Sequence, residues 1–521
     1  MLPVFTAEEM RRLDRRAIDD LGLPGPVLME NAGRGAAAAI AAFARRERLR
    51  GDVVIVCGKG GNGGDGFVVA RELRRRRWRA RVLLLAPPAE VRSDAALKLR
   101  ALRRAGVRPI VITDERALDA GLAGATLIVD AILGTGARGA PSGLVAHAIE
   151  SMNASGRPIV ALDAPSGLDS DHGIPLGPCV RAALTTTFAA LKRGLVLEPG
   201  AGFAGRVEVV DIAIPPAEVA RATATFLLER ADIAPWFPPR KQDVHKGTYG
   251  HLLVVGGSLG KTGAAALAGS AAMRSGAGLV TVATAASQQP VVAGLTLEGM
   301  TEALPETAAH TVSAKAREPI GDLAAARDAV ALGPGLGLDA ETQALARELV
   351  RDLERPLAVD ADALTSLAGH LDVLTSARGP RCLTPHPGEM ARMLGVSIAD
   401  VQRDRIECAR RFAVEHRVHV VLKGARSVIA DPEGRVYLNP TGNPGMASGG
   451  TGDVLTGILG AFLARRLPPG AAMQCAVYLH GLAGDVAAAR VGHESLIASD
   501  VVAALPDAFA RLRASEHDDR A

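Results

Sequence analysis

Short apolar runs that alternate with helix-like segments constrain the fold of this chain more than any other feature. In the first half these runs lie at positions 52–56, 80–85, 126–130 and 158–163, and the first of them is too short and too β-branched for a helix. Each run is followed by sequence with helical character, which is the pattern of strand–helix units in a parallel sheet. Because helices cover both faces of such a sheet, the pattern predicts an α/β fold.

The second half of the chain repeats this arrangement. Its apolar runs lead into small or polar residues and lie at positions 251–255, 329–332, 357–359, 382–384 and 419–422. Because open α/β sheets bind their ligands outside the carboxyl ends of the strands, we expect a second doubly wound domain with its site along one edge. Proline pairs at 215–216 and 238–239 interrupt helices and central strands alike. We therefore predict domains at 1–220 and 241–521, joined by a linker at 221–240.

Composition excludes several classes of protein. The formal charge of +4 over 521 residues gives no support for nucleic-acid binding. The five cysteines are scattered and form no Cys-x-x-Cys pair, so neither a disulfide framework nor a zinc site is expected. No signal-peptide pattern opens the chain, and the uncharged stretch at 275–297 holds too many polar residues and glycines for a membrane span. We expect a cytoplasmic protein with no membrane partner.

A glycine-rich stretch at 443–453 reads Asn-Pro-Gly-Met-Ala-Ser-Gly-Gly-Thr-Gly-Asp and runs into an apolar segment of helical character. A glycine-rich turn that opens a helix directs backbone N–H groups and the positive end of the helix dipole at an anion. Its one carboxylate, Asp453, falls at the helix start, where it is either an N-cap or a base. The stretch holds more glycine than a cap requires, which favours a phosphate-handling site with a catalytic Asp453.

A second glycine-rich segment, at 57–66, follows the first strand of the first domain. Gly58, Gly60 and Gly63 satisfy Gly-x-Gly-x-x-Gly between a strand and a helix. The acidic residue expected at the end of the second strand is missing, which argues against dinucleotide binding in the manner of a dehydrogenase. The additional polar pair Asn62 and Asp65 indicates a site that contacts more than a pyrophosphate.

Polar residues end two further strands of the first domain. Asp130 precedes another glycine-rich loop, and Asp163 is followed shortly by Ser166. Each aspartate alone could be a helix cap or a loop stabiliser. Together Asn62, Asp130 and Ser166 offer only oxygen ligands and little charge, which fits a weakly held monovalent cation better than zinc. Asp163 is then free for proton transfer.

Several residues of the second domain remain open on local grounds. Residues 256–262 imitate a P-loop, but Val255 stands where its first glycine should be, so that interpretation fails on spacing. His386, between two prolines, is favoured as a ligand contact in a loop over a core histidine. Asp360 and Asp362 could be helix caps, and Lys423 is either solvated or directed at phosphate.

The motifs of the first domain resemble the NAD(P)H-hydrate epimerase family. The matching segments are residues 61–65, Asp130 with 134–140, and residues 163–169. The resemblance covers about residues 1–215 and implies a Rossmann-like three-layer fold that interconverts the R and S forms of hydrated NADH and NADPH. It also implies K⁺ at Asn62, Asp130 and Ser166, and Lys192 stands where the family has a lysine, with no role indicated by spacing. The implied substrate-binding residues are Gly61, Asn62, Gly63, Gly64, Asp65, Gly134, Thr135, Gly136, Ala137, Arg138, Gly139, Ala140 and Asp163.

The second domain resembles the NAD(P)H-hydrate dehydratase family, a branch of the ribokinase-like α/β fold. The matching segments are residues 245–247, 255–258, 276–280, 333–337, 360–364, 384–389 and 443–453. The resemblance implies that the hydrate binds near Ala264, Gly335, His386 and Asp453. It implies nucleotide contacts at Lys423, Gly424, Ala425, Arg426, Ser427 and Gly452. One departure is Thr365, where asparagine is common.

The two resemblances imply one repair reaction. Asp453 accepts the proton of the C6 hydroxyl of the S hydrate while a phosphoryl group is transferred to its oxygen, and the backbone N–H groups of 449–452 stabilise the phosphoryl charge. We expect ADP as co-substrate with Mg²⁺, giving AMP and phosphate, and a homo-oligomer. The alternatives are a small-molecule kinase fused to a nucleotide-binding domain, and a binding protein whose first half has lost its chemistry.

Overall fold

The computed structural model describes residues 1–514, and the chain divides into two compact units. The first unit spans Leu2–Ala224, and the second holds Met1 and the chain from Thr225 onward. Residues 515–521 of the predicted second domain lie outside the described residues. Each unit combines a mainly parallel sheet with helices on both faces, so the predicted α/β class is confirmed.

The first unit is built on a parallel sheet in the strand order β4-β3-β2-β5-β6-β7-β9. A separate parallel pair joins β1 to β8. The strands are β1 (Leu2–Phe5), β2 (Asp52–Cys57), β3 (Arg79–Leu84), β4 (Ile110–Val111), β5 (Ala125–Ala131), β6 (Ile159–Leu162), β7 (Leu184–Phe188), β8 (Leu191–Lys192) and β9 (Arg206–Val210). The helices are α1 (Ala7–Asp19), α2 (Gly25–Arg46), α3 (Gly61–Arg75), α4 (Ser93–Arg104), α5 (Glu115–Leu122), α6 (Gly143–Ala154), α7 (Arg193–Val196), α8 (Gly200–Ala204) and α9 (Pro216–Arg221).

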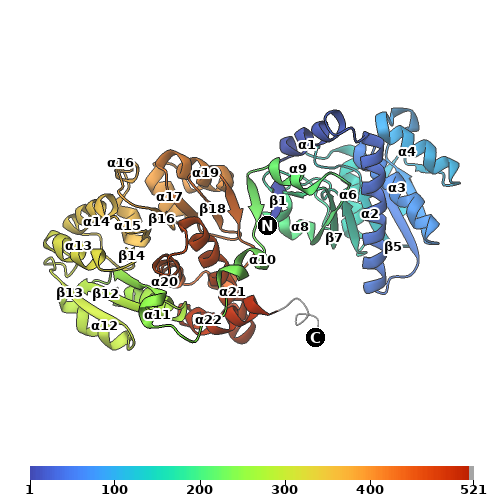
Figure 1. Cartoon of the computed structure of the whole chain (residues 1–521). Coiled ribbons are helices and arrows are strands. Elements are labelled where there is room, and N and C mark those ends of the chain that lie inside the picture. The colour runs from blue at the N-terminus through green and yellow to red at the C-terminus, as the bar shows by residue number, and fades with distance from the viewer. Residues whose placement is uncertain (515–521) are drawn as a thin grey trace. The chain divides into compact units, whose positions relative to one another are not determined.

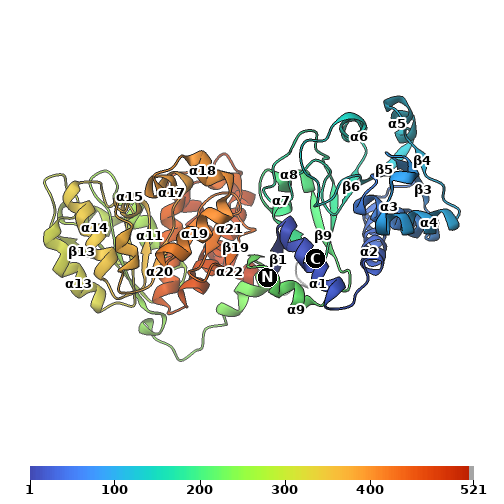
Figure 2. The same cartoon turned by 90° about the horizontal axis from the view of Figure 1, so that it is seen from above.

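Side-chain alternation along β2 divides the core of this unit into two layers. Val53, Ile55 and Cys57 pack with α1, α2, α3 and α4, whereas Val54 and Val56 pack with α5 and α6. Successive residues of a strand face opposite sides of a sheet, so a run that is apolar throughout must be covered on both. Figure 2 shows α5 and α6 on one side of the strands and α2, α3 and α4 on the other.

The second unit carries a longer sheet in the strand order β13-β12-β11-β14-β15-β16-β17-β18-β19-β10, parallel except at the β17–β18 and β18–β19 pairs. The strands are β10 (Thr225–Leu227), β11 (His251–Val255), β12 (Leu279–Ala285), β13 (Met300–Leu304), β14 (Ala329–Leu332), β15 (Leu357–Val359), β16 (Arg381–Leu383), β17 (His419–Leu422), β18 (Val428–Ala430) and β19 (Val436–Leu438). The helices are α10 (Arg230–Ile233), α11 (Thr262–Arg274), α12 (Gln289–Leu295), α13 (Arg317–Ala325), α14 (Ala340–Asp352), α15 (Ala361–Ser366), α16 (Asp372–Thr375), α17 (Pro387–Leu394), α18 (Ile398–Arg403), α19 (Arg405–His416), α20 (Thr451–Ala464), α21 (Pro469–Val491) and α22 (Ala498–Arg513).

Helix α20 lies at the centre of the second unit's core. It packs with α11, α21 and α22 against one face of the sheet, where Leu252, Val254 and Ala331 are fully buried. In Figure 1, α11 and α22 lie below the strands of this unit, and α14 and α19 lie above them. The helix begins at Thr451, directly after Gly450 in the left-handed conformation, so the glycine-rich stretch opens it as predicted.

Local backbone and capping contacts decide where helices start in the first unit. Thr6 and Glu9 exchange hydrogen bonds that form a capping box at the start of α1. The helix expected after the fourth strand is absent, since residues 163–183 form turns and irregular backbone. Asp163 itself adopts a φ of 64°, which is uncommon for a residue with a side chain and prevents a helix from starting there. Among the residues described, none of the helices has the length and apolar character of a membrane span.

The crossing of α11 and α20 supplies a stability test. A Cβ added to Gly457 would lie 2.1 Å from the carbonyl oxygen of Ala268, so Gly457→Ala must force the two backbones apart. We expect a loss of about 2 kcal/mol, as for other overpacked cores, measured as a lower melting temperature of the second domain. Gly321→Ala in α13 is the matched control because nothing lies within 4 Å of its added Cβ. Equal melting temperatures for the two variants would contradict the close crossing.

Candidate functional site

A cavity of about 890 Å³ opens at the carboxyl ends of the strands in the first unit. Its wall comes from α1, from the first turn of α3 after β2, from the loop after β5, and from the start of the segment after β6. Among the predicted residues it brings together Gly61, Asn62, Asp65, Gly134, Thr135, Gly136, Ala137 and Asp163, and it adds Asp14 and Lys192. Residues that are far apart in the sequence therefore meet at one edge of the sheet.

Asp163 is held in this cavity by a buried ion pair. Its Oδ1 lies 2.7 Å from Nζ of Lys192, a side chain that is only 1% exposed. Its Oδ2 accepts hydrogen bonds from the backbone N–H of Thr135 at 3.1 Å and from the Thr135 hydroxyl. Burial alone would raise the pKa of Asp163, but the Lys192 ammonium and the Thr135 donors outweigh it and lower the pKa below its ordinary value. The carboxylate is therefore ionised at neutral pH.

Two further carboxyl groups line the same cavity, and their pKa values are raised where that of Asp163 is lowered. Burial and the neighbouring Asp163 charge raise the pKa of Asp65 well above its ordinary value. Burial also raises the pKa of Asp14, with Lys192 opposing that effect. One cavity thus holds an ionised carboxylate beside carboxyl groups that retain protons more readily. Such a set can both accept and donate protons, as general acid–base catalysis requires.

An oxygen cluster lies beneath the cavity. Asp130 is fully buried, and its carboxylate accepts hydrogen bonds from the Ser166 hydroxyl at 2.6 Å and from the Ser166 N–H at 2.8 Å. The amide of Asn62 donates to the carbonyl oxygens of Leu133 and Leu162, yet its own Oδ1 is buried without a hydrogen-bond partner. An unpartnered buried oxygen near a carboxylate and carbonyl oxygens fits a monovalent cation with oxygen ligands.

The other predicted residues of the first unit surround the cavity without lining it; they are Gly63, Gly64, Arg138, Gly139 and Ala140. Gly63 has a structural reason to be glycine, because a Cβ there would lie 1.9 Å from the carbonyl oxygen of Gly58. The loop after β2 can therefore turn tightly into α3 and present the side chains of Asn62 and Asp65.

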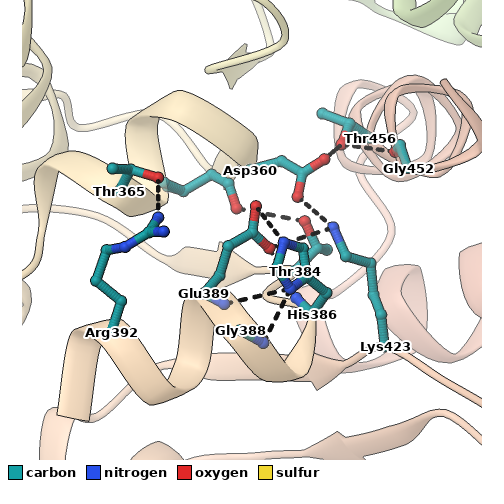
Figure 3. A network of polar contacts seen from close by, with 11 residues as sticks. Asp360, Thr365, Thr384, His386, Gly388, Glu389, Arg392, Lys423, Gly452 and Thr456 are labelled. Atoms are coloured by element: carbon teal, nitrogen blue, oxygen red, sulfur yellow. Dashed lines mark hydrogen bonds and ion pairs between the residues drawn. The ribbon is translucent and has the colours of Figure 1, made fainter. Parts of the chain in front are cut away.

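In the second unit, three strand ends converge on a buried ion-pair network (Figure 3). Asp360 follows β15, Thr384 follows β16 and Lys423 follows β17. Nζ of Lys423 lies 2.7 Å from Oδ1 of Asp360 and 3.7 Å from Oε2 of Glu389. Asp360 occupies the N-cap position of α15, but its side chain makes no capping hydrogen bond. The lysine is therefore neither solvated nor unpaired, and the aspartate serves the network instead of the helix end.

Asp453 lies in the first turn of α20, beside this network. Its neighbour Gly452 is close to the ion pair, because a Cβ added there would lie 3.5 Å from Nζ of Lys423 and 3.7 Å from Oδ2 of Asp360. Burial and the Asp360 carboxylate raise the pKa of Asp453 to about 7. A group with that pKa can accept a proton at neutral pH, as a general base must.

The loop that precedes Asp453 is held in place from both sides. The Thr451 hydroxyl donates to the carbonyl oxygens of Met446 and Ser448, at 3.0 and 2.9 Å. The Asn443 side chain and the Gly442 N–H both donate to Asp485 of α21. The N–H groups at the start of α20 are therefore fixed in direction before any anion binds.

His386 has a structural task that the sequence did not indicate. Its Nδ1 accepts hydrogen bonds from the N–H groups of Gly388 and Glu389, so it caps α17. Glu389 completes the capping box by accepting from the His386 N–H at 2.7 Å (Figure 3). The imidazole is 55% exposed, and its Nε2 lies 3.6 Å from Oε1 of Glu389.

Ala264 and Gly335 are neighbours, since a Cβ on Gly335 would lie 3.2 Å from that of Ala264. The loop after β14 is tied to the same region because the N–H of Gly337 donates to Asp362 at 2.9 Å. Lys261, the lysine of the rejected P-loop, pairs with the same Asp362 oxygen at 2.9 Å. The two residues predicted to contact the hydrate therefore share one corner of the site.

The predicted nucleotide-contacting residues 423–427 form the connection between β17 and β18. The guanidinium of Arg405, at the start of α19, donates to the carbonyl oxygens of Leu422, Lys423 and Ala425. Arg426 adopts a φ of 54° and donates to the carbonyl oxygen of Pro440 at 2.8 Å. These contacts shape the connection, and Lys423 links it to the ion-pair network.

Sequence reasoning missed four participants in these sites: Asp14, Thr135 as a partner of Asp163, Glu389 and Thr456. Thr456 donates its hydroxyl to Oδ2 of Asp360 at 2.7 Å, across 96 positions of sequence. No local pattern marks such a contact. Its only signal is a polar residue in an otherwise apolar helix, where it is fully buried. Across the described residues, His, Cys, Asp and Glu side chains form no group of three suited to hold a metal ion.

Two family models match the chain. The model described as NAD(P)H-hydrate dehydratase matches residues 252–507, and the model described as YjeF-related protein N-terminus matches residues 25–194. Each match falls within one of the two compact units.

Curated relatives match almost the whole chain. A protein of Moorella thermoacetica named bifunctional NAD(P)H-hydrate repair enzyme Nnr is 47% identical, and the match covers 96% of each chain. The Escherichia coli protein of the same name is 36% identical over 96% of this chain and 93% of its own. Among solved structures, an ADP/ATP-dependent NAD(P)H-hydrate dehydratase from Bacillus subtilis, co-crystallised with ATP and Mg²⁺, is 33% identical with a TM-score of 0.48. That match covers 55% of this chain and 98% of the Bacillus chain.

The Asp163–Lys192 pair supplies a stability test. Lys192→Met leaves a buried carboxylate without its partner, and we expect a loss of about 3–5 kcal/mol at neutral pH. The double variant Lys192→Met/Asp163→Asn removes that charge and should recover part of the loss. Because Lys192 lowers the pKa of Asp163, its contribution is present above the ordinary carboxyl pKa and is lost as the pH falls through the lower folded value. Thermal unfolding of the first domain over acidic and neutral pH measures this, and a difference that persists in acid would contradict it.

Proposed function

The chain belongs to the family of bifunctional NAD(P)H-hydrate repair enzymes, and from that membership we propose how its residues divide the work. It epimerises the R and S hydrates of NADH and NADPH and dehydrates the S form. The observation that supports two separate sites is that each unit has its own half-buried aspartate, Asp163 or Asp453, among polar residues that follow the carboxyl ends of its strands. The ribokinase-like assignment of the second domain follows from the same membership.

We assign epimerisation to a domain at 1–220 and dehydration to a domain at 241–521, with a linker at 221–240 whose strand β10 and helix α10 pack in the second unit. The family matches at 25–194 and 252–507 support this order along the chain. We also expect a homo-oligomer, which light scattering of the purified protein measures. The kinase alternative is not favoured, since relatives that match both halves carry the name of hydrate repair enzymes.

For epimerisation we place the hydrated ring in the cavity of the first unit, between residues 61–65 and 134–140. Inversion at C6 requires one bond of that carbon to break and re-form, with a proton moved on and off an oxygen. Asp163 is ionised and held by Lys192 and Thr135, which suits it to accept that proton. Asp65 lines the same cavity and retains its proton more readily, which suits it to donate.

We propose K⁺ at Asn62, Asp130 and Ser166, where the buried and unpartnered Oδ1 of Asn62 supports it. A bound cation there would supply positive charge next to the loops that contact the hydrate. The carbonyl oxygen of Leu133 is a further candidate ligand, because it lies 3.3 Å from the Ser166 hydroxyl oxygen and accepts from the Asn62 amide at 2.7 Å.

For dehydration we propose Asp453 as the base that takes the proton of the C6 hydroxyl. The oxygen of that hydroxyl receives a phosphoryl group from ADP in the same step. The N–H groups of 449–452 are placed to stabilise the charge on that group, as at other helix starts that bind phosphate. Phosphate then leaves with the C6–O bond, C5 loses a proton and the ring double bond is restored. The products are NADH or NADPH, AMP and phosphate.

The remaining predicted residues fit around this reaction. The hydrate would contact Ala264, Gly335 and the exposed edge of His386, and the nucleotide would contact residues 423–427 and Gly452. Lys423 is held by Asp360 and Glu389, which fixes its ammonium beside the start of α20. Mg²⁺ is proposed to be bound through nucleotide phosphate oxygens, the usual manner for this ion.

A pair of variants tests the assignment of two sites. We expect Asp453→Asn to slow dehydration about 10²–10⁴-fold, the usual range for a lost general base, and to leave epimerisation intact. We expect Asp163→Asn to slow epimerisation by a similar factor and to leave dehydration intact. The full chain is mixed with ADP, Mg²⁺, K⁺ and both NADH hydrate epimers, and the absorbance of the reduced nicotinamide ring is followed. Wild type should recover all of the NADH, and Asp163→Asn only the share present as the S form. Na⁺ in place of K⁺ should slow the epimerisation phase alone.

Asp339→Asn, at the N-cap of α14, serves as the control for a carboxylate-to-amide change. Asparagine caps a helix about as well as aspartate does, so this variant should keep both activities. Damage to both activities by either active-site variant, in protein that is still folded, would disprove separate sites. No recovery by wild type with ADP or ATP would disprove hydrate repair itself.

The pH dependence of dehydration tests Asp453 as the base. Its pKa of about 7 means that the ionised form increases as the pH rises through neutrality. We expect kcat/KM for the hydrate to fall about tenfold per pH unit below the pKa of Asp453 and to level off above it, because at saturating ADP kcat/KM reports the pKa of the ADP-bound enzyme before the hydrate binds. Initial rates at saturating ADP and low hydrate concentration, between about pH 5 and pH 8, measure this. A flat profile would show that a different group accepts the proton.

A further inference from the structure

A second cavity, of about 580 Å³, lies in the second unit away from the catalytic edge. Its walls are the segment 238–249 that leads into β11, the end of α11, the residue after α20, and α22. The segment before β11 and the end of α11 lie at the amino ends of the strands that they precede. Asp360, Lys423 and the other network residues follow the carboxyl ends of their strands, so the two sites occupy opposite edges of the sheet.

All the charged residues that the structure describes along this cavity are cationic. They number five, and none of the described aspartates or glutamates lines it. The five are Arg240, Lys241, Arg274, Arg465 and Arg513. In the described part of the chain none of them forms an ion pair with a carboxylate, whereas the neighbouring Arg466 pairs with Asp328. Guanidinium groups that converge without counter-charges are the usual composition of a site for phosphate groups.

The arginines are held in place by neutral groups. Arg240 stacks on the ring of Tyr249 at 3.9 Å and donates to the carbonyl oxygen of Gly276 at 3.0 Å. Arg465 lies over the ring of Phe237 at 5.2 Å and donates to the carbonyl oxygen of Ser275 at 3.2 Å. Burial and the nearby Arg240 charge lower the pKa of Arg465, as expected where like charges lack a counter-ion. Aromatic and carbonyl contacts orient the donors but leave their charge uncompensated.

A second observation also points to a ligand here. Ser275 lines the cavity at the end of α11, is fully buried, and its hydroxyl has no hydrogen-bond partner. Buried hydroxyl groups are nearly always satisfied, so this one indicates that the end of α11 lacks a partner that the described residues do not supply. The hydroxyl has no accessible surface, so the contacts with a ligand fall to the exposed guanidinium groups.

We propose that this cavity binds a polyphosphate group, either as inorganic polyphosphate or as the phosphate chain of a nucleotide. Several negative charges on one ligand match five cations better than a single phosphate does, and the Tyr249 and Phe509 rings offer an apolar wall for an organic part of the ligand. The site is separate from the substrate and co-substrate sites of both reactions. A ligand bound there contacts both α11 and α22, which pack against the catalytic helix α20.

Calorimetric titration of the full chain with inorganic tripolyphosphate tests the proposal. The variant Arg274→Gln/Arg513→Gln removes two exposed cations of the cavity, and we expect its Kd to rise at least about tenfold, since each lost charge-assisted bond weakens binding severalfold. The control Arg411→Gln/Arg511→Gln removes two exposed cations elsewhere and should bind like wild type. Both double variants keep the glycine-rich loop, so any tripolyphosphate that binds there gives the same heat in wild type and in both variants. That shared binding is subtracted before the affinities for the cavity are compared.

The outcomes are distinct. Equal binding by wild type and both double variants, or no binding by wild type, would overturn the site. Unchanged dehydration rates and melting temperatures in both double variants show that the fold and the active site are intact. If the first variant fails to fold, Lys241→Gln, which removes one exposed cation, should still weaken binding, and its failure to do so overturns the proposal. If ADP displaces tripolyphosphate from the binding that Arg274→Gln/Arg513→Gln abolishes, the ligand of the cavity is a nucleotide. If ADP does not displace it, the ligand is inorganic polyphosphate.

Discussion

Burial of charged groups at the ends of parallel strands is the constraint on which both sites depend. A carboxylate or an ammonium that leaves water must be paired, or it changes its protonation state. Both units meet this requirement with a lysine: Lys192, which is fully buried, pairs with Asp163, and Lys423, which is 19% exposed, pairs with Asp360. The two units differ in which aspartate forms the ion pair with the lysine. In the first unit the lysine pairs with the proposed base itself, and in the second it pairs with a neighbour of the proposed base.

This difference sets the chemistry of each aspartate. Lys192 and Thr135 keep Asp163 ionised despite its burial, so the group is ready to accept a proton over a broad range of pH. Asp453 lacks a lysine of its own, and burial together with the nearby charge of Asp360 raises its pKa to about 7. A base with such a pKa accepts a proton effectively and releases it readily afterwards, which suits a step that ends with the loss of phosphate. One fold class thus supports two kinds of carboxylate through the placement of a single cation.

Periodicity and strand ends in the sequence predicted much of this arrangement. The strands β2, β5 and β11 lie where β-branched apolar runs indicated them, because a central strand of a parallel sheet has little freedom to be anything else. The polar residues at the strand ends do meet, since topology alone brings carboxyl ends together. The partners of the buried charges could not be predicted, because contacts such as Thr456 with Asp360 join distant segments through packing. The irregular segment after β6 was missed for a related reason: the strained backbone of Asp163 positions a side chain and leaves no local pattern.

The two edges of the second unit's sheet show that compensation of charge is selective. At the catalytic edge the cation Lys423 has two carboxylate neighbours, whereas at the opposite edge the five cations have none among the described residues. Four of the five are exposed and Arg465 is half-buried, so water screens their mutual repulsion only in part. Aromatic rings and carbonyl oxygens instead orient Arg240 and Arg465 while their charge persists. At the catalytic edge the carboxylates of Asp360 and Glu389 neutralise the charge of Lys423. At the opposite edge a bound anion would neutralise the five cations, and unlike a carboxylate of the chain it can dissociate.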